Sequence, residues 1–207
     1  NPDWWLGRLV GFNLNQPLGI TQSFGAFGVV LFFLISGYLL PLERGGRLSF
    51  AGKKLLKLYP PLLISFASFW LVQKVVGLMT GPTFWASFSP RQWMLGATLL
   101  NYPLGEPDVI NGTTWFLFPT LLFYFLGWLF LPWFQKKPKL AAAGCLLVLG
   151  GGLWAAVSLP LPSVLVNVLS FGWYVSFPLF GALVYWLREK KMGFGWFLMF
   201  SGINYLL

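Results

Sequence analysis

The stretch FGAFGVVLFFLISGYLL, residues Phe24–Leu40, decides the fold class of this chain. It is an almost wholly apolar run, and Ser36 and Tyr38 are its polar side chains. A basic segment follows at once and leads into Leu58-Tyr59-Pro60-Pro61. A helix needs about 20 mainly apolar residues to cross the hydrocarbon core of a bilayer. Because the run can begin near Ile20, we predict a transmembrane helix here.

The composition of the whole chain agrees with a membrane protein. Of its 207 residues, 57% are hydrophobic and 9% are charged, whereas a soluble domain carries about 25% charged residues. Lipid must therefore cover apolar surface that the chain cannot bury within itself. The net charge of +9 does not indicate a nucleic-acid partner, because the cations lie in short loops, where they set topology and contact anionic lipid. We expect membrane lipid as a partner and no nucleic acid.

Span lengths predict an all-α fold, a polytopic transmembrane helical bundle that forms one domain over residues 1–207. A sixth helix begins near Met192 and is cut off at Leu207, whereas the other five are long enough to cross a bilayer. These five predicted spans are Phe24–Leu40, Tyr59–Met79, Thr114–Phe134, Leu140–Leu159 and Val164–Leu187.

The loops between these spans alternate in charge. Eleven of the 14 Lys and Arg residues lie in every second loop, namely Pro41–Leu58, Gln135–Lys139 and Arg188–Lys191. The intervening loops, Thr80–Thr113 and Pro160–Ser163, hold Arg91 alone. Loops rich in Lys and Arg stay in the cytoplasm, so residue 1 is expected outside. An outside start at Asn1 without a translocation signal, and an end inside an apolar run, lead us to expect an internal piece of a longer protein, with an upstream helix missing.

The outer loop Thr80–Thr113 is the longest between spans. Ser89 followed by Pro90 is typical of an N-cap with proline at the first helical position, which predicts a short helix Pro90–Leu100 in the membrane interface. Beyond it lie Glu106, Asp108 and Asn111, the polar cluster of the outer face. No metal site is expected, because the chain has one cysteine, Cys145, and no histidine.

Three motifs, taken together, resemble a known family. The tract Gly28–Leu40 resembles the Gly-Val-Asp-Leu-Phe-Phe-x-x-Ser-Gly-Tyr/Phe signature of the acyltransferase 3 family of integral membrane acyltransferases. The segment Lys53–Pro60 resembles the family's Arg-x-x-Arg-hydrophobic-Tyr-Pro motif. The tract Asn111–Leu117, with Tyr124 and Pro132 beyond it, is similar to its Trp-x-Leu…Tyr…Pro segment. The three motifs occur in the family's order.

The resemblance implies acyl transfer across the membrane, from a cytoplasmic acyl-CoA, usually acetyl-CoA, to a sugar hydroxyl of a cell-envelope or exported glycan. It places the protein in the bacterial cytoplasmic membrane, with acyl-CoA as co-substrate and no tightly bound cofactor. The residues expected to bind the donor are Lys53, Lys54, Lys57 and Tyr59. The residues expected to meet the acceptor or line its path are Ser36, Glu106, Asp108, Asn111 and Trp115.

The chain departs from the family pattern at its reactive positions. The family's catalytic His has no counterpart here, so no catalytic residue is assigned and this piece is expected to be inactive alone. Val30 stands at the signature Asp, and Thr120 stands at the acidic position after the Trp. Lys54 and Lys57 replace an Arg pair, which keeps the charge but loses bidentate geometry. Two alternatives remain: a transporter or flippase for a lipid or sugar, and a non-catalytic relative of the acyltransferases.

Purely structural interpretations of the same residues stay open as well. Gly28, Ser36 and Gly37 are small residues that allow close helix packing in membranes. Lys53, Lys54 and Lys57 also serve as charges that anchor a loop inside the cell.

The charge alternation predicts that a tag on Asn1 is outside the cell. A membrane-impermeant reagent should label this tag in intact cells, because the Lys-rich and Arg-rich loops hold the other side in the cytoplasm. Labelling that requires opening the cell would reverse the predicted topology of every span.

Overall fold

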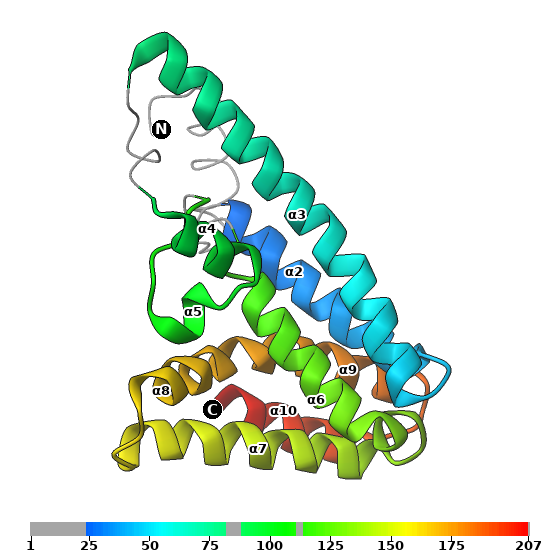
Figure 1. The fold of residues 1–207 in the computed structure, drawn as a ribbon. Helices are drawn as coiled ribbons and strands as arrows, with labels where there is room; N and C mark the ends of the chain where they lie inside the picture. The colour runs from blue at the N-terminus through cyan, green and yellow to red at the C-terminus, as the bar shows by residue number, and fades with distance from the viewer. Residues whose placement is uncertain (1–23, 82–87, 111–113, 207) are drawn as a thin grey trace, which may run out of the picture.

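The computed structural model describes residues 24–81, 88–110 and 114–206, which fold into helices joined by short connections (Figure 1). No strand occurs within these ranges. In chain order the helices are α2 (Phe24–Leu39), η2 (Leu40–Leu42), α3 (Arg47–Thr80), α4 (Pro90–Ala97), α5 (Asn101–Leu104), α6 (Leu117–Lys136), α7 (Pro138–Ser158), α8 (Ser163–Ser170), η4 (Phe171–Val175), α9 (Ser176–Arg188) and α10 (Phe194–Leu206).

Four helical segments of the described chain are long and apolar enough to cross a membrane. They are α3, α6, α7 and the continuous stretch Ser163–Arg188, which runs through α8, η4 and α9. Helix α2 is shorter, with 16 residues, and α10 has 13. The prediction of an all-α membrane bundle is confirmed, and the chain is an integral membrane protein.

The predicted loop Pro41–Leu58 is wrong from Arg47 onward, because α3 begins at Arg47 and runs for 34 residues. Lys and Leu are good helix formers, so the basic segment continues the apolar span instead of linking to it. Pro60 and Pro61 lie inside this helix, although proline removes a backbone donor there. At about 1.5 Å per residue, α3 is roughly 51 Å long, longer than the hydrocarbon core of a bilayer.

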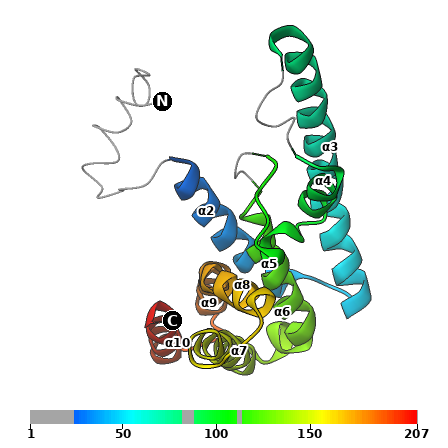
Figure 2. The same ribbon diagram turned by 60° about the vertical axis from the view of Figure 1, so that its left-hand side comes forward.

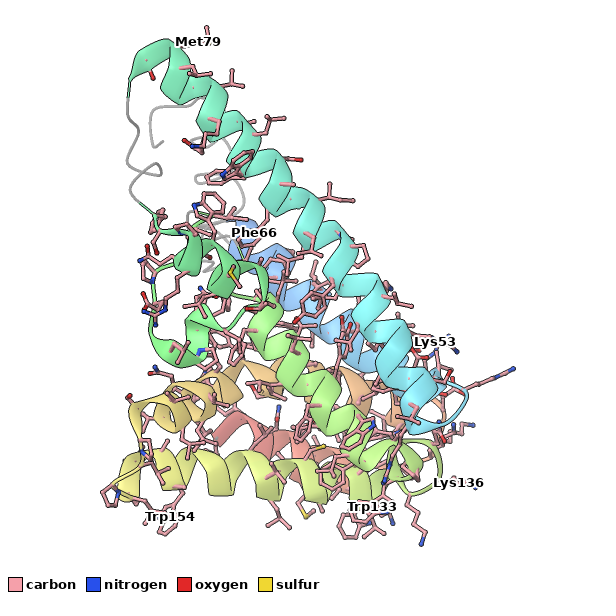
Figure 3. The ribbon with its side chains drawn as sticks, in the orientation of Figure 1. Lys53, Phe66, Met79, Trp133, Lys136 and Trp154 are labelled. Atoms are coloured by element: carbon pink, nitrogen blue, oxygen red, sulfur yellow. The ribbon has the colours of Figure 1, made fainter. Side chains whose placement is uncertain are left out.

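The basic connections lie at one end of the bundle. In Figure 1 the turns α2–α3, α6–α7 and α9–α10 gather on the right, and the α7–α8 connection lies on the left. Figure 3 places Lys53 and Lys136 on that basic side, with Trp154 at the opposite end. In Figure 2, α2 and α3 rise away from the base that α7, α8, α9 and α10 form. This arrangement agrees with the loop alternation predicted from charge.

The segment between α3 and α6 confirms the predicted N-cap. The Ser89 hydroxyl accepts from Gln92 N at 3.3 Å, and Gln92 Oε1 accepts from Ser89 N at 2.9 Å, which together form a capping box. The helix ends at Ala97 and not at Leu100 as predicted, because the chain turns at Leu99, whose φ is +60°. Leu99 is nonetheless buried between α3 and the segment before α6.

Helices α2 and α9 cross with their backbones in contact. A Cβ on Gly37 would lie 1.6 Å from the carbonyl oxygen of Pro178, and a Cβ on Gly181 would lie 2.0 Å from that of Leu34. Neither position has space for any side chain. Small residues permit such close approach between membrane helices, and here they lock α2 to α9.

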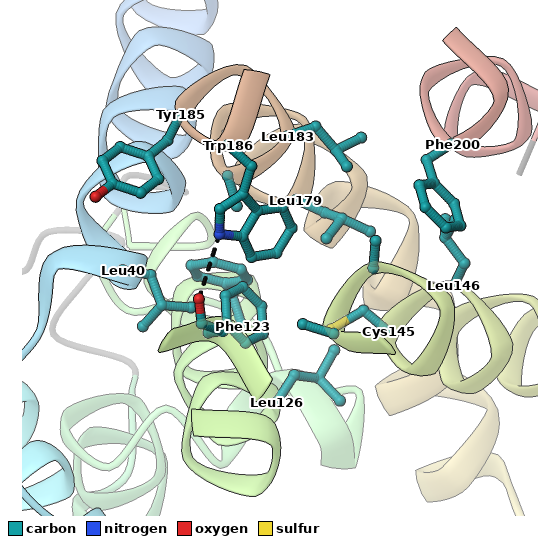
Figure 4. Packing of buried hydrophobic residues seen from close by; sticks show 14 of the residues in the cluster. Leu40, Phe123, Leu126, Cys145, Leu146, Leu179, Leu183, Tyr185, Trp186 and Phe200 are labelled. Carbon is teal, nitrogen blue, oxygen red and sulfur yellow. Dashed lines mark hydrogen bonds between the residues drawn. The ribbon is translucent and has the colours of Figure 1, made fainter. Parts of the chain in front are cut away.

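The main core lies between α6, α7 and α9 and reaches the end of α2 (Figure 4). Trp186 is its largest fully buried side chain, and its indole Nε1 donates to the Phe134 carbonyl oxygen at 3.2 Å. Cys145 and Phe123 pack against the same cluster. Since a buried indole N–H needs a partner, this bond fixes the end of α6 against α9.

Gly37→Ala should lower the free energy of unfolding by about 3 kcal/mol, because the added methyl overlaps the α9 backbone, which cannot yield as a flexible side chain can. The measurement is denaturant unfolding in detergent micelles. Gly77→Ala in α3 is the matched control, because a Cβ there meets nothing within 4 Å, and it should leave stability unchanged or slightly higher. Equal stability of the two variants would contradict the contact.

Candidate active site

A central cavity of about 770 Å³ lies between α2, α3, α6 and the segment that precedes α6. It reaches from two lysines of α3 to Ile110 and Thr114 of the segment before α6. The side chains and backbone that line it are those of Gly28, Val29, Phe32, Ile35, Ser36, Leu39, Lys54, Lys57, Leu58, Pro61, Leu62, Ser65, Ile110, Thr114, Phe116, Leu117 and Tyr124. Its walls therefore come from all three motifs singled out in the sequence.

One face of α2 forms a wall of this cavity. Gly28, Phe32 and Ser36 follow one another at intervals of four residues, so they share one side of the helix. The residues that follow two of them, Phe33 and Gly37, are buried on the adjacent side, toward α9. The sequence allowed two interpretations of this tract, close helix packing and a substrate path, and each fits part of it. Gly37 serves close packing, whereas Gly28 and Ser36 face the cavity.

The basic end of the cavity carries two lysines, of which one is ion-paired and one is not. The Lys54 ammonium forms an ion pair with Glu43 and lies 5.5 Å from the ring centroid of Phe50 and 5.2 Å from that of Tyr124. Lys57, one turn further along α3, lines the cavity and has no ion pair within the described chain. Lys57 is therefore the cation that is left to bind an incoming anion.

A hydrogen-bonded network closes the end of the cavity that is opposite the lysines. Asp108 Oδ2 accepts from the Tyr102 hydroxyl at 2.6 Å and from the Thr114 hydroxyl at 2.9 Å, and its Oδ1 accepts from Ile110 N at 2.7 Å. Burial raises the pKa of Tyr102, and the hydrogen bond to Asp108 raises it further. The Tyr102 hydroxyl therefore stays protonated and keeps donating at neutral pH. Through this network Asp108 holds Thr114 at the cavity wall.

The other predicted site residues that the structure describes do not line the cavity. Lys53 is exposed on α3, and the Tyr59 hydroxyl lies 3.5 Å from the Thr98 carbonyl oxygen, on the side of α4. Glu106 forms an ion pair with Arg91 at 3.4 Å. The Trp115 ring packs on Tyr174, with 4.8 Å between the centroids.

Asn111 lies outside the described residues. Of the nine predicted site residues, the structure thus brings three to the cavity, Ser36, Lys54 and Lys57, and it connects a fourth, Asp108, through Thr114.

Tyr124, which lines the cavity, and Glu43 and Tyr102, which contact residues at its two ends, were not predicted as site residues. Glu43 pairs with Lys54 across the turn between η2 and α3, and a Glu eleven positions before a Lys is no recognisable pattern. Tyr102 reaches Asp108 only because α5 folds back beside the segment before α6. Tyr124 was noted as part of a motif, and its position nine residues after Trp115 is the feature from which its place in the cavity could have been inferred.

The side chains that line the cavity are better suited to an uncharged acyl chain than to a charged ligand. The described lining residues supply the hydroxyls of Ser36, Ser65, Thr114 and Tyr124 and two ammonium groups, but no carboxylate. At the position of the family's acidic residue, the Thr120 hydroxyl donates to the Phe116 carbonyl oxygen at 2.7 Å. The cavity can thus hold an acyl chain between a cationic end and a hydroxyl-bearing end, and these lining residues offer no strong base.

Comparison with known proteins gives one match. A family model described as an acyltransferase domain matches residues 3–206. No curated protein and no solved structure matches the chain. The family match covers nearly the whole sequence, including every motif that lines the cavity.

Asp108→Asn should lower the free energy of unfolding by about 2 kcal/mol, because the amide nitrogen cannot accept and leaves a part-buried hydroxyl without its partner. Hydrogen exchange at Thr114 and the amides that follow should accelerate as well. The control, Glu106→Gln, removes a largely exposed ion pair and should change stability by less than about 1 kcal/mol. Equal effects of the two substitutions would show that Asp108 does not hold Thr114.

Proposed function

Because the chain belongs to the acyltransferase 3 family, we propose that this membrane acyltransferase moves an acyl group, chiefly acetyl, from cytoplasmic acyl-CoA to a sugar hydroxyl. The acceptor is a glycan of the cell envelope or one that is exported. The protein then sits in the bacterial cytoplasmic membrane with residue 1 outside. Its partners are anionic lipid, the acyl-CoA donor and the glycan acceptor.

The observation that carries this proposal is the central cavity. It joins Lys54 and Lys57, on the basic side of the bundle, to Thr114 and Ile110 on the other side. An acyl donor with phosphates needs cations at one end of the path, and an acceptor with hydroxyls needs hydrogen-bonding groups at the other end. Lysine binds phosphate as a point charge, and the Tyr102–Asp108–Thr114 network offers hydrogen bonds of the kind that orient a sugar hydroxyl.

The reaction balances with the donor and acceptor alone. The acceptor hydroxyl oxygen attacks the thioester carbonyl carbon, a C–O bond forms and the C–S bond breaks. The hydroxyl proton ends on the sulfur, so the products are an ester and free CoA thiol. Such attack needs a base in hydrogen-bond reach of the hydroxyl. This chain's described cavity residues position the reactants, and the hydroxyls of Ser36 and Tyr124 line the same path.

The chain's residues divide between the two substrates under this proposal. Lys57 binds a donor phosphate, while Lys54, held by Glu43, positions the entrance. Lys53, exposed on the same helix, adds positive charge next to Lys54, whereas Tyr59 contacts Thr98 and takes no part in this entrance. On the acceptor side, Asp108 acts through Thr114, and the residues expected to meet the glycan are Glu106, Asn111 and Trp115.

The test is the O-acetyl content of envelope glycans in a strain whose gene is deleted and then complemented. Wild-type protein should restore acetylation, and Lys57→Gln should restore about a tenth or less, because a charge-assisted contact to phosphate is lost. Lys136→Gln is the control, since this exposed lysine lies at the same end and outside the cavity. Unchanged O-acetyl content of every envelope glycan after deletion would refute the proposal.

A further inference from the structure

A second cavity of about 430 Å³ opens at the basic end of the bundle. It shares no lining residue with the central cavity. Its walls come from η2 and the turn that follows it, from the end of α6, and from the end of α9 with the α9–α10 turn. The residues that line it are Pro41, Leu42, Glu43, Arg44, Gly45, Gln135, Tyr185 and Lys191.

The walls of this second cavity are held by hydrogen bonds between distant parts of the chain. Gln135 Nε2 donates to the Glu43 carbonyl oxygen at 2.8 Å and ties α6 to the η2–α3 turn. The backbone N–H of Lys191 donates to the Trp186 carbonyl oxygen at 2.9 Å, which fixes the start of the α9–α10 turn. Lys191 Nζ lies 3.4 Å from the Tyr185 hydroxyl and 5.1 Å from its ring centroid. The cavity is therefore formed before any ligand arrives.

The charges around this cavity do not balance. Glu43 is its one acidic lining residue, and its carboxylate is already paired with Lys54 of the central cavity. Arg44 and Lys191 form no ion pair within the described chain. Two cations thus face a space whose single carboxylate is engaged elsewhere. A phosphate monoester, with a charge between −1 and −2 and three acceptor oxygens, complements this set.

We propose that the second cavity binds the terminal phosphate monoester of the acyl donor, the 3′-phosphate of its nucleotide end, through Arg44 and Lys191. This inference rests on the proposed function. The Glu43–Lys54 ion pair stands between the two cavities, because Glu43 lines one and Lys54 lines the other. A donor whose thioester arm enters the central cavity past Lys57 has its nucleotide end outside, beside the second cavity.

The test compares CoA with 3′-dephospho-CoA, which differ only in this phosphate, by calorimetry on the protein in nanodiscs. Wild-type protein should bind CoA about tenfold more tightly than the dephospho form, as expected for a hydrogen-bonded charge pair. Lys191→Gln and Arg44→Gln should each remove most of this difference and leave binding of the dephospho form nearly unchanged. Lys190→Gln, in the same turn but outside the cavity, should keep the full difference.

The possible results distinguish failure of the phosphate site from failure of the proposed function. If wild-type protein binds both nucleotides equally, the phosphate site is wrong and the acyl-CoA donor stands. If it binds neither nucleotide, the proposed donor and this site fail together. A preference for CoA that survives both substitutions would also refute the site. If those substitutions instead weaken only binding to vesicles of phosphatidylglycerol, relative to phosphatidylcholine, the cavity serves a lipid headgroup and its assignment to the 3′-phosphate is overturned.

Discussion

The backbone contact between α2 and α9 is the constraint on which the site depends. Gly37 lies against the carbonyl oxygen of Pro178 so closely that a methyl group has no space. Phe33, one turn earlier, is buried on the same side and stacks on Phe177 with 6.4 Å between ring centroids. Once these two residues are fixed against α9, helical geometry turns the preceding pair, Phe32 and Ser36, toward the central cavity. The tract therefore presents two adjacent faces of α2. Phe33 and Gly37 pack against α9, whereas Phe32 and Ser36 line the central cavity.

Charge is distributed so that little of it lies within the bilayer. Ionisable groups in lipid are costly unless they are paired or face water. Lys54, on the wall of the central cavity, meets this cost with Glu43 and two aromatic rings. At the other end, Asp108 is surrounded by hydroxyl and backbone donors. Apart from Lys54 and Lys57, the side chains that line the central cavity are uncharged and need no counter-charge.

The sequence predicted those features that depend on composition and length. Span length and the alternation of basic loops were enough for an all-α membrane bundle, and the structure places the basic turns at one end. The start of α3 was mistaken because the basic segment Arg47–Leu58 was interpreted as a loop, although its Lys and Leu residues favour helix. The pairing of Glu43 with Lys54 and of Tyr102 with Asp108 was beyond prediction, because both depend on how the chain turns between helices.

The same charge distribution limits which part of an acyl donor can enter the membrane under the proposed function. Phosphates carry charges whose burial is expensive without cations, and the cations of the site lie at its basic end. The acyl group and the arm that carries it are neutral, so they can pass Lys57 and lie along the uncharged walls of the central cavity. The charged nucleotide then stays at the entrance while the thioester advances toward Thr114. A site built in this way selects for a long neutral arm between phosphate and thioester, because a shorter donor would hold its reactive carbon too near the basic end to meet an acceptor from the other side.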